Sequence, residues 1–185
     1  MLIRLLFFIL CFWSMSTFGQ AGIYAVKSGQ VNFSSEAPKE LISASSKKLK
    51  GILDIEKRTF AFIIDIVSFT GFNNTLQREH FNENYLESNL FAAATYKGKI
   101  IEDIDLSKDG TYSIRTKGKL NIHGIEQERI IKVLLVVKKG KISASGNFPV
   151  ALTDHDIKIP RVMNDKLSPE IQVAVQAIFQ AQAIK

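Results

Sequence analysis

Side chains alternate between apolar and polar along residues 111–122, and this period of two constrains the fold more than any other feature. The apolar or small face of this stretch comprises Tyr112, Ile114, Thr116, Gly118, Leu120 and Ile122. Such alternation is typical of a β-strand with one buried face. Similar rows occupy residues 42–46, 49–55, 60–66 and 92–100. About eight or more strands of roughly 9–12 residues, joined mainly by hairpins, predict an all-β chain folded as an antiparallel barrel or sandwich.

Residues 75–89 do not alternate, and they predict one helical insertion in this β-rich chain. Leu76, Phe81 and Tyr85 recur at helical spacing, and either Asn74 or Thr75 is placed to cap the first turn. We expect about three turns of helix. A carboxylate stripe on this helix is expected to face solvent; it comprises Glu79, Glu83 and Glu87.

Two glycine-containing turns set the expected strand pairing. Residues 108–110, Lys-Asp-Gly, suit a three-residue hairpin loop with Gly110 in the left-handed conformation. Opposite residues of an antiparallel pair share a face, and the resulting register pairs Ser107 with Thr111, Gly98 with Leu120 and Asp103 with Arg115. A second hairpin is expected to turn at Lys139 and Gly140.

The C-terminal segment, residues 170–183, fits two kinds of structure. Ile171, Val173 and Val175 alternate as in a strand, whereas the Ala and Gln content and the Ser-Pro-Glu start at residues 168–170 would suit a helix. We favour the strand, because a long sheet needs its edges paired or closed.

Residues 1–19 have the organisation of an export signal. Arg4 precedes an apolar run over residues 5–13, and small residues follow at Thr17 and Gly19. The run is shorter than the roughly 20 residues that span a bilayer, and the pattern is typical of a cleaved signal peptide. We expect one domain over residues 20–185 and a periplasmic location. Cys11 is the only cysteine, so the mature chain would form no internal disulfide.

The net charge of +6 is mildly basic. No clustered Arg/aromatic motif accompanies it, so nucleic acid is not an expected partner. A basic exported protein is attracted to anionic surfaces. Transient contact with a membrane surface is therefore left open. A homodimer is left open as well.

Small residues interrupt the inward faces of the expected strands. They are Ala44, Ser46, Gly51, Ala94, Gly98, Thr116, Gly118, Ala144 and Gly146. In a closed sheet of about eight strands, small inward residues either permit sharp bending or leave a lumen. Bending accounts for several glycines, but Ala and Ser do little to bend a sheet. We therefore expect an enclosed apolar space suited to a long, thin, apolar ligand; a structural or stress-related barrel with a packed interior is the alternative.

Two groups of polar residues suggest an alternative hydrolase. His80 lies at helical spacing from Glu83 and Glu87, but a zinc hydrolase would need a second nearby histidine, as in H-E-x-x-H. Asp154 and Asp156 flank His155, although Asp residues in such a corner usually bond neighbouring N–H groups of a turn. No serine-nucleophile elbow, phosphate loop or dinucleotide fingerprint occurs. We expect no catalytic residues, no metal and no cofactor, and hence not an enzyme.

Six short motifs, in order along the chain, resemble those of the YceI-like family. They are GQVNFSSEAP at 29–38, FTGF at 69–72, REHFNENYLES at 78–88, ATYKG at 94–98, KGKLNIHG at 117–124 and LTDHDIKIP at 152–160. The resemblance covers essentially the whole mature chain. It implies an extended, lipocalin-like barrel in the bacterial periplasm whose lumen holds a long amphiphile, such as a polyisoprenoid or fatty-acyl derivative.

The expected ligand-binding residues come from two sources. The resemblance places five in the helix and loop beside the lumen: Phe69, Phe72, Phe81, Tyr85 and Leu86. Alternation places four more on inward strand faces: Phe62, Tyr96, Ile114 and Phe148.

Overall fold

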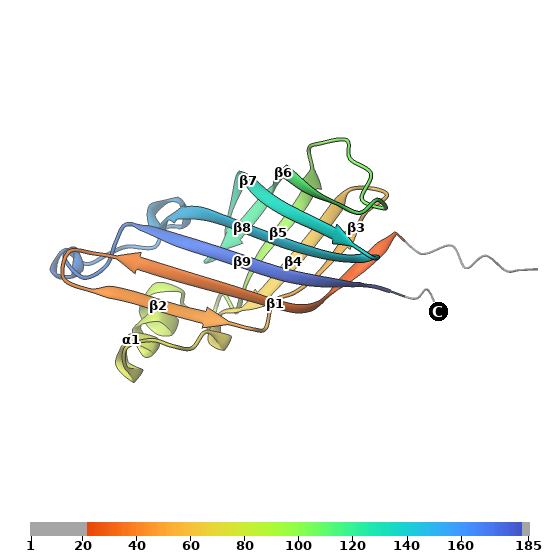
Figure 1. Ribbon diagram of the computed structural model, residues 1–185. Helices are drawn as coiled ribbons and strands as arrows, with labels where there is room; N and C mark the ends of the chain where they lie inside the picture. The colour runs from red at the N-terminus through yellow and green to blue at the C-terminus, as the bar shows by residue number, and fades with distance from the viewer. Residues whose placement is uncertain (1–21, 183–185) are drawn as a thin grey trace, which may run out of the picture.

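Nine strands form one antiparallel sheet in the computed structural model, which describes residues 22–182 (Figure 1). The strands are β1 (Ile23–Glu36), β2 (Leu41–Ser46), β3 (Lys50–Asp54), β4 (Thr59–Asp65), β5 (Ala93–Ile100), β6 (Gly110–Ile122), β7 (Ile125–Lys138), β8 (Lys141–Ala151) and β9 (Glu170–Ala181). The predicted signal peptide, residues 1–19, lies outside the described residues.

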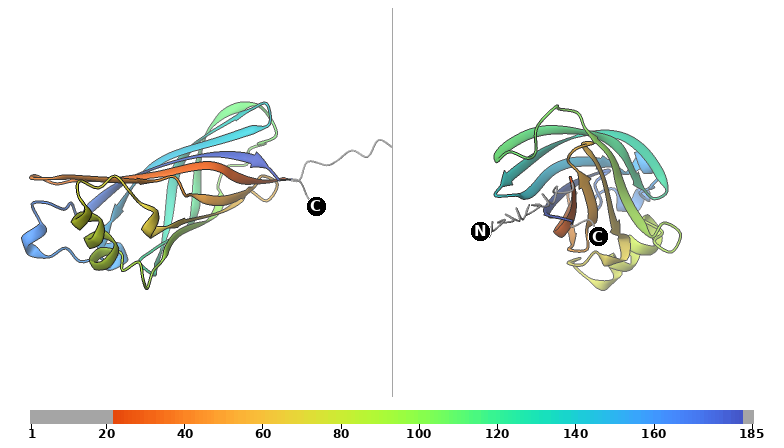
Figure 2. Two further views of the ribbon diagram at one scale, coloured as in Figure 1. Left: turned by 90° about the horizontal axis from the view of Figure 1, so that it is seen from below. Right: turned by 90° about the vertical axis from the view of Figure 1, so that its right-hand side faces the viewer.

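Strand β1 closes the sheet into a barrel because both of its edges are paired. One edge pairs with β9, from Tyr24 opposite Ala181 to Ser34 opposite Gln172. The other edge pairs first with β3 and then with β2. Strands β1 and β3–β9 therefore form an eight-stranded ring, and β2 extends the wall (Figure 2). The predicted antiparallel barrel of about eight strands is confirmed.

The C-terminal segment is a strand rather than a helix. Strand β9 pairs with β8 along one edge and with β1 along the other. Its polar backbone groups are thus used on both sides, which removes an exposed sheet edge.

The helical insertion has about the predicted three turns, but it ends at Tyr85 rather than near residue 89. Asn74 caps helix α1 (Thr75–His80), its side chain accepting a bond from the Gln77 N–H at 2.9 Å. A π-helical turn, η2 (Phe81–Tyr85), continues it. The helix then ends because Glu87 adopts a left-handed φ of 42°, a conformation common at helix C-termini. As predicted, Glu79, Glu83 and Glu87 are exposed.

The predicted register between β5 and β6 is wrong by two residues. Gly98 lies opposite Gly118, and Tyr96 lies opposite Leu120. The connection is a nine-residue loop, not a three-residue turn, and Gly110 is the first residue of β6. The Glu102 carboxylate holds the loop by accepting bonds from the Arg115 N–H (2.7 Å) and Nε (2.8 Å). A shift of two residues leaves every side chain on its predicted face.

The predicted turn at Lys139 and Gly140 is confirmed. Lys138 pairs with Lys141 across these two residues, whose φ angles are 52° and 71°. Two positive φ angles identify a type I′ turn, which favours Asn-Gly.

We expect Lys139→Asn to stabilise the protein by about 0.5 kcal/mol, because Asn tolerates a left-handed φ better than Lys does. Its N–H would still donate to Asp109, as the Lys139 N–H does at 2.9 Å. Urea unfolding measures the gain. Lys138→Asn is the control, because Lys138 lacks a positive φ; an equal gain there would contradict the explanation.

Short helical turns cover the end of the barrel that carries α1. They are η1 (Ile66–Ser68), η3 (Leu152–His155) and η4 (Arg161–Met163). A second apolar cluster packs there, comprising Ile66, Leu86, Leu152, Ile157 and Leu167. No helix within residues 22–182 is long and apolar enough to cross a membrane.

Candidate ligand-binding cavity

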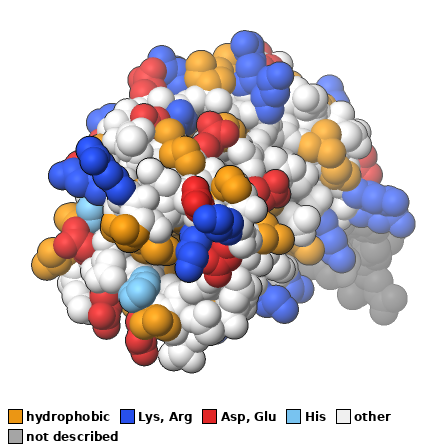
Figure 3. Space-filling view, turned by 90° about the vertical axis from the view of Figure 1, so that its left-hand side faces the viewer, with side chains coloured by type: hydrophobic (Ala, Val, Ile, Leu, Met, Phe, Trp, Pro, Cys, Tyr) orange, Lys and Arg blue, Asp and Glu red, His pale blue; other side chains and the backbone are white. Residues whose placement is uncertain are grey.

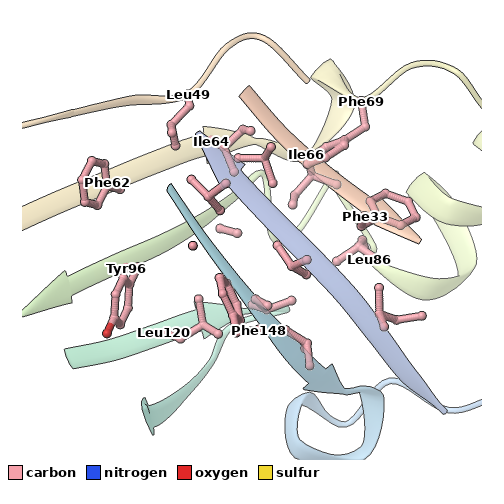
Figure 4. Close-up of a pocket in the computed structure, with 18 of the residues that line it drawn as sticks. Phe33, Leu49, Phe62, Ile64, Ile66, Phe69, Leu86, Tyr96, Leu120 and Phe148 are labelled. Carbon is pink, nitrogen blue, oxygen red and sulfur yellow. The ribbon is translucent and has the colours of Figure 1, made fainter. Parts of the chain in front are cut away.

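A cavity of about 520 Å³ occupies the barrel interior. Aliphatic and aromatic side chains from all parts of the sheet surround it (Figure 4). Ligand pockets in proteins commonly have volumes of about 300–1,000 Å³. The space is therefore large enough for an organic ligand, and its lining favours an apolar one.

One end of the cavity is bounded by aromatic rings from three strands. The Tyr96 ring lies 4.9 Å from that of Phe60, and Phe62 lies 6.1 Å from Phe179. The Tyr96 hydroxyl is 3.0 Å from Thr116 Oγ1, which donates to the Ile131 carbonyl at 3.1 Å. Burial raises the pKa of Tyr96. These polar atoms are bonded to one another, so they leave an apolar surface toward the cavity.

Four phenylalanines bound the opposite end and attach the helical insertion to the sheet. Phe33 of β1 stacks on Phe81 of η2 with ring centres 5.3 Å apart. Phe72 lies 5.1 Å from Phe81, and Phe69 lies 5.5 Å from Phe33. Aromatic pairs at such separations add about 0.5–1.5 kcal/mol beyond area burial. The insertion is thus one wall of the cavity.

Polar residues border the cavity beside α1. They are Glu40, Asn74, Gln77, His80 and Lys166. Gln77 Nε2 donates to Glu40 Oε1 at 2.5 Å, which joins α1 to the turn between β1 and β2. This end of the molecule presents apolar side chains among charges of both signs (Figure 3). A polar head group would be solvated here while an attached chain lies inside.

All nine residues predicted to bind ligand line this one cavity: Phe62, Phe69, Phe72, Phe81, Tyr85, Leu86, Tyr96, Ile114 and Phe148. Their contact with a ligand stays a prediction. The prediction omitted Phe33, Ile64, Ile66, Val173 and Phe179, which also line the cavity. Ile64, Ile66, Val173 and Phe179 lie an even number of positions from residues already identified as inward on the same stretch. Alternation could therefore have identified these four.

The small inward residues serve two different purposes. Ala94, Thr116, Ala144 and Gly146 line the cavity. Gly98 and Gly118 instead allow close approach of β5 and β6: a Cβ on Gly118 would lie 2.4 Å from the Lys97 carbonyl oxygen. The first four positions agree with the predicted lumen, and close approach of the strands accounts for Gly98 and Gly118. The alternative role of small residues in bending the sheet stays a prediction.

The two candidate catalytic groups do not assemble. Glu87 bonds the His123 Nε2 at 2.6 Å rather than His80. Asp154 pairs with Arg129 at 2.7 Å, whereas Asp156 is exposed. Residues 22–182 contain no group of three or more His, Cys, Asp or Glu side chains placed to hold a metal ion.

His155 is a buried structural histidine. It is 0% exposed, and its Nδ1 donates to the Ile125 carbonyl at 3.1 Å. Its Nε2 has no hydrogen-bond partner within the described part of the chain, as suits a neutral ring. Burial lowers the pKa of His155 below its usual 6.5.

We expect the free energy of unfolding to decrease as the pH falls below about 6.5. Below this pH the His155 side chain is protonated in the unfolded chain, whereas burial keeps it neutral in the folded protein. This contribution is complete above pH 6.5 and is lost toward the lower pKa of the folded state. Urea unfolding between pH 5 and 8 measures it. His155→Gln should flatten this part of the profile, and an unchanged slope would contradict the assignment.

Comparison with known proteins identifies the fold and the family. The chain matches the family described as YceI-like domain over residues 16–179. A polyisoprenoid binding domain from Saccharophagus degradans superimposes with a TM-score of 0.74 at 14% identity, covering 86% of this chain and 98% of that one.

Two further solved structures share the fold. Burkholderia cenocepacia BcnA has a TM-score of 0.67 at 14% identity and covers 81% of this chain and 95% of its own. A Campylobacter jejuni YceI protein has a TM-score of 0.57 at 15% identity and covers 75% and 85% respectively. No curated protein matches the chain. Because the family match spans most of the sequence, the chain belongs to the YceI-like family.

Proposed function

We propose that the protein is a periplasmic carrier that holds a long-chain amphiphile of the polyisoprenoid or fatty-acyl type in its barrel. The observation on which this rests is the apolar cavity of about 520 Å³ inside a closed sheet. The likeness to a polyisoprenoid binding domain supports the choice of ligand class. The export pattern of residues 1–19 supports the location.

The cavity volume limits how much ligand is enclosed. A cavity of about 520 Å³ is of the size that takes one organic ligand, such as a single alkyl or prenyl chain. Each buried methylene contributes about 0.8 kcal/mol. A single chain is thus bound mainly by removal of apolar surface from water.

The geometry favours binding over catalysis. Glu87 bonds His123 rather than His80, Asp154 pairs with Arg129, and most residues that line the cavity are aliphatic or aromatic. A packed structural barrel is the other alternative, and the size of the cavity argues against it.

Native mass spectrometry of freshly purified protein tests the proposal. We expect a bound species whose mass matches a single-chain amphiphile, with the same compound recovered by organic extraction. Apo protein combined with failure to take up both a fluorescent fatty-acyl and a prenyl probe would refute the carrier function.

A further inference from the structure

Strands β7 and β8 are paired only beside their turn. The last pair is Leu134 opposite Ser145. Beyond it, β7 stays paired with β6 as far as Ile125, and β8 stays paired with β9 as far as Ala151. The two strands meet at their turn and separate away from it (Figure 1). We name this opening the seam: residues 126–133 of β7 and 146–151 of β8.

Side chains, not a backbone ladder, close the far end of the seam. Arg129 Nη2 donates to Asp154 Oδ2 at 2.7 Å, and Gln127 Nε2 donates to the Asp154 carbonyl at 2.7 Å. Pro149 of β8 has no N–H to contribute to a ladder. A boundary held by so few bonds opens at lower free energy than a paired one.

The seam borders the candidate ligand cavity. Ile131 and Val133 of β7 and Gly146 and Phe148 of β8 line that cavity. Separation of the two strands would therefore expose the apolar interior at the side of the barrel.

The outer surface beside the seam is both apolar and cationic. Ile130 is 60% exposed and Leu134 is 45% exposed. Four exposed lysines lie on the same two strands and their turn: Lys132, Lys138, Lys139 and Lys141. None of their ammonium groups has a carboxylate within 4.0 Å among residues 22–182, whereas Glu126 and Glu128 are already paired with lysines of β5 and β6.

We propose that this side of the barrel docks on an anionic lipid bilayer and exchanges the amphiphile through the seam. Exposed apolar side chains flanked by lysines suit the interface of such a bilayer. Docking brings the seam against the lipid, so an apolar chain could pass between bilayer and lumen without crossing water. The exchange step rests on the proposed carrier function, but docking does not.

Sedimentation with lipid vesicles tests the docking. The seam variant carries Lys132→Gln and Leu134→Ser. The matched control carries Lys99→Gln and Ile52→Ser. Ile52 is 49% exposed, and the Lys99 ammonium group lacks a carboxylate partner in the described chain. A lysine beside an anionic membrane contributes about fivefold in affinity. We expect the seam variant to bind equimolar phosphatidylglycerol–phosphatidylcholine vesicles at least fivefold more weakly, and the control to bind as wild type does. Pure phosphatidylcholine vesicles should bind all three weakly.

Probe transfer separates this proposal from the proposed function. Loaded with a fluorescent fatty-acyl probe, the seam variant should transfer it to anionic vesicles at least fivefold more slowly, although its uptake at equilibrium is unchanged. Equal losses in variant and control, or wild-type protein that does not sediment with anionic vesicles, would overturn the docking face. Normal uptake with unchanged transfer would overturn the seam route and leave the carrier function intact. Absence of uptake would instead count against the carrier function.

Discussion

Replacing Ala94 with phenylalanine is expected to lower the affinity for a single-chain amphiphile more than tenfold while the barrel stays folded. Ala94 lines the cavity from β5, opposite Ile64 of β4. A phenyl ring there would occupy space otherwise available to the ligand. If only two methylenes of the ligand are no longer buried, binding loses about 1.6 kcal/mol. This corresponds to a decrease in affinity of more than tenfold.

Titration with a fluorescent fatty-acyl probe measures this loss, and urea unfolding shows whether the barrel is intact. The matched control is Ala61→Phe, because Ala61 of β4 is exposed on the outer face. That variant should bind as wild type does. If Ala94→Phe instead unfolds the protein as an overpacked core does, the interior has less free space than we describe.

Gly118→Ala is expected to destabilise the barrel by about 3 kcal/mol. The new Cβ would lie 2.4 Å from the Lys97 carbonyl oxygen and 3.0 Å from its carbon. Because both are backbone atoms paired in the sheet, β5 and β6 would have to separate. Chemical unfolding measures the change.

Gly146→Ala is the comparison for this variant. Gly146 also faces the interior, but a Cβ there would approach its nearest neighbour, the Lys132 carbonyl oxygen, only to 3.2 Å. We expect a loss below about 1 kcal/mol. Similar losses at both positions would show that close approach of β5 and β6 is not the reason for Gly118.

Alternation along the sequence was enough to assign residues to the inside or the outside of the barrel. The pleat places every second side chain on the same face, so Phe62, Tyr96, Ile114 and Phe148 could be identified as inward without knowing which strands are neighbours. All four line the cavity. For the same reason the two-residue error in register moved none of them to the other face.

Features set by contacts between distant residues could not be predicted in this way. The register of β5 and β6 depends on Glu102 bonding Arg115 and on Arg58 bonding Asp103 at 2.6 Å. The seam was missed because β7 alternates in the same way whether or not its neighbour is paired. The helical insertion ends before a left-handed Glu87, whose carboxylate bonds His123 of the β6–β7 turn.

An electron-density map of protein purified without removal of lipid tests the carrier function most directly. We predict a continuous tube of density in the barrel, from Phe62 and Tyr96 at one end to Phe33 and Phe81 at the other. Its polar end should emerge beside Gln77 and the other residues that border the cavity. A lumen closed by inward collapse of its side chains, or one filled by discrete ordered waters, would contradict the account.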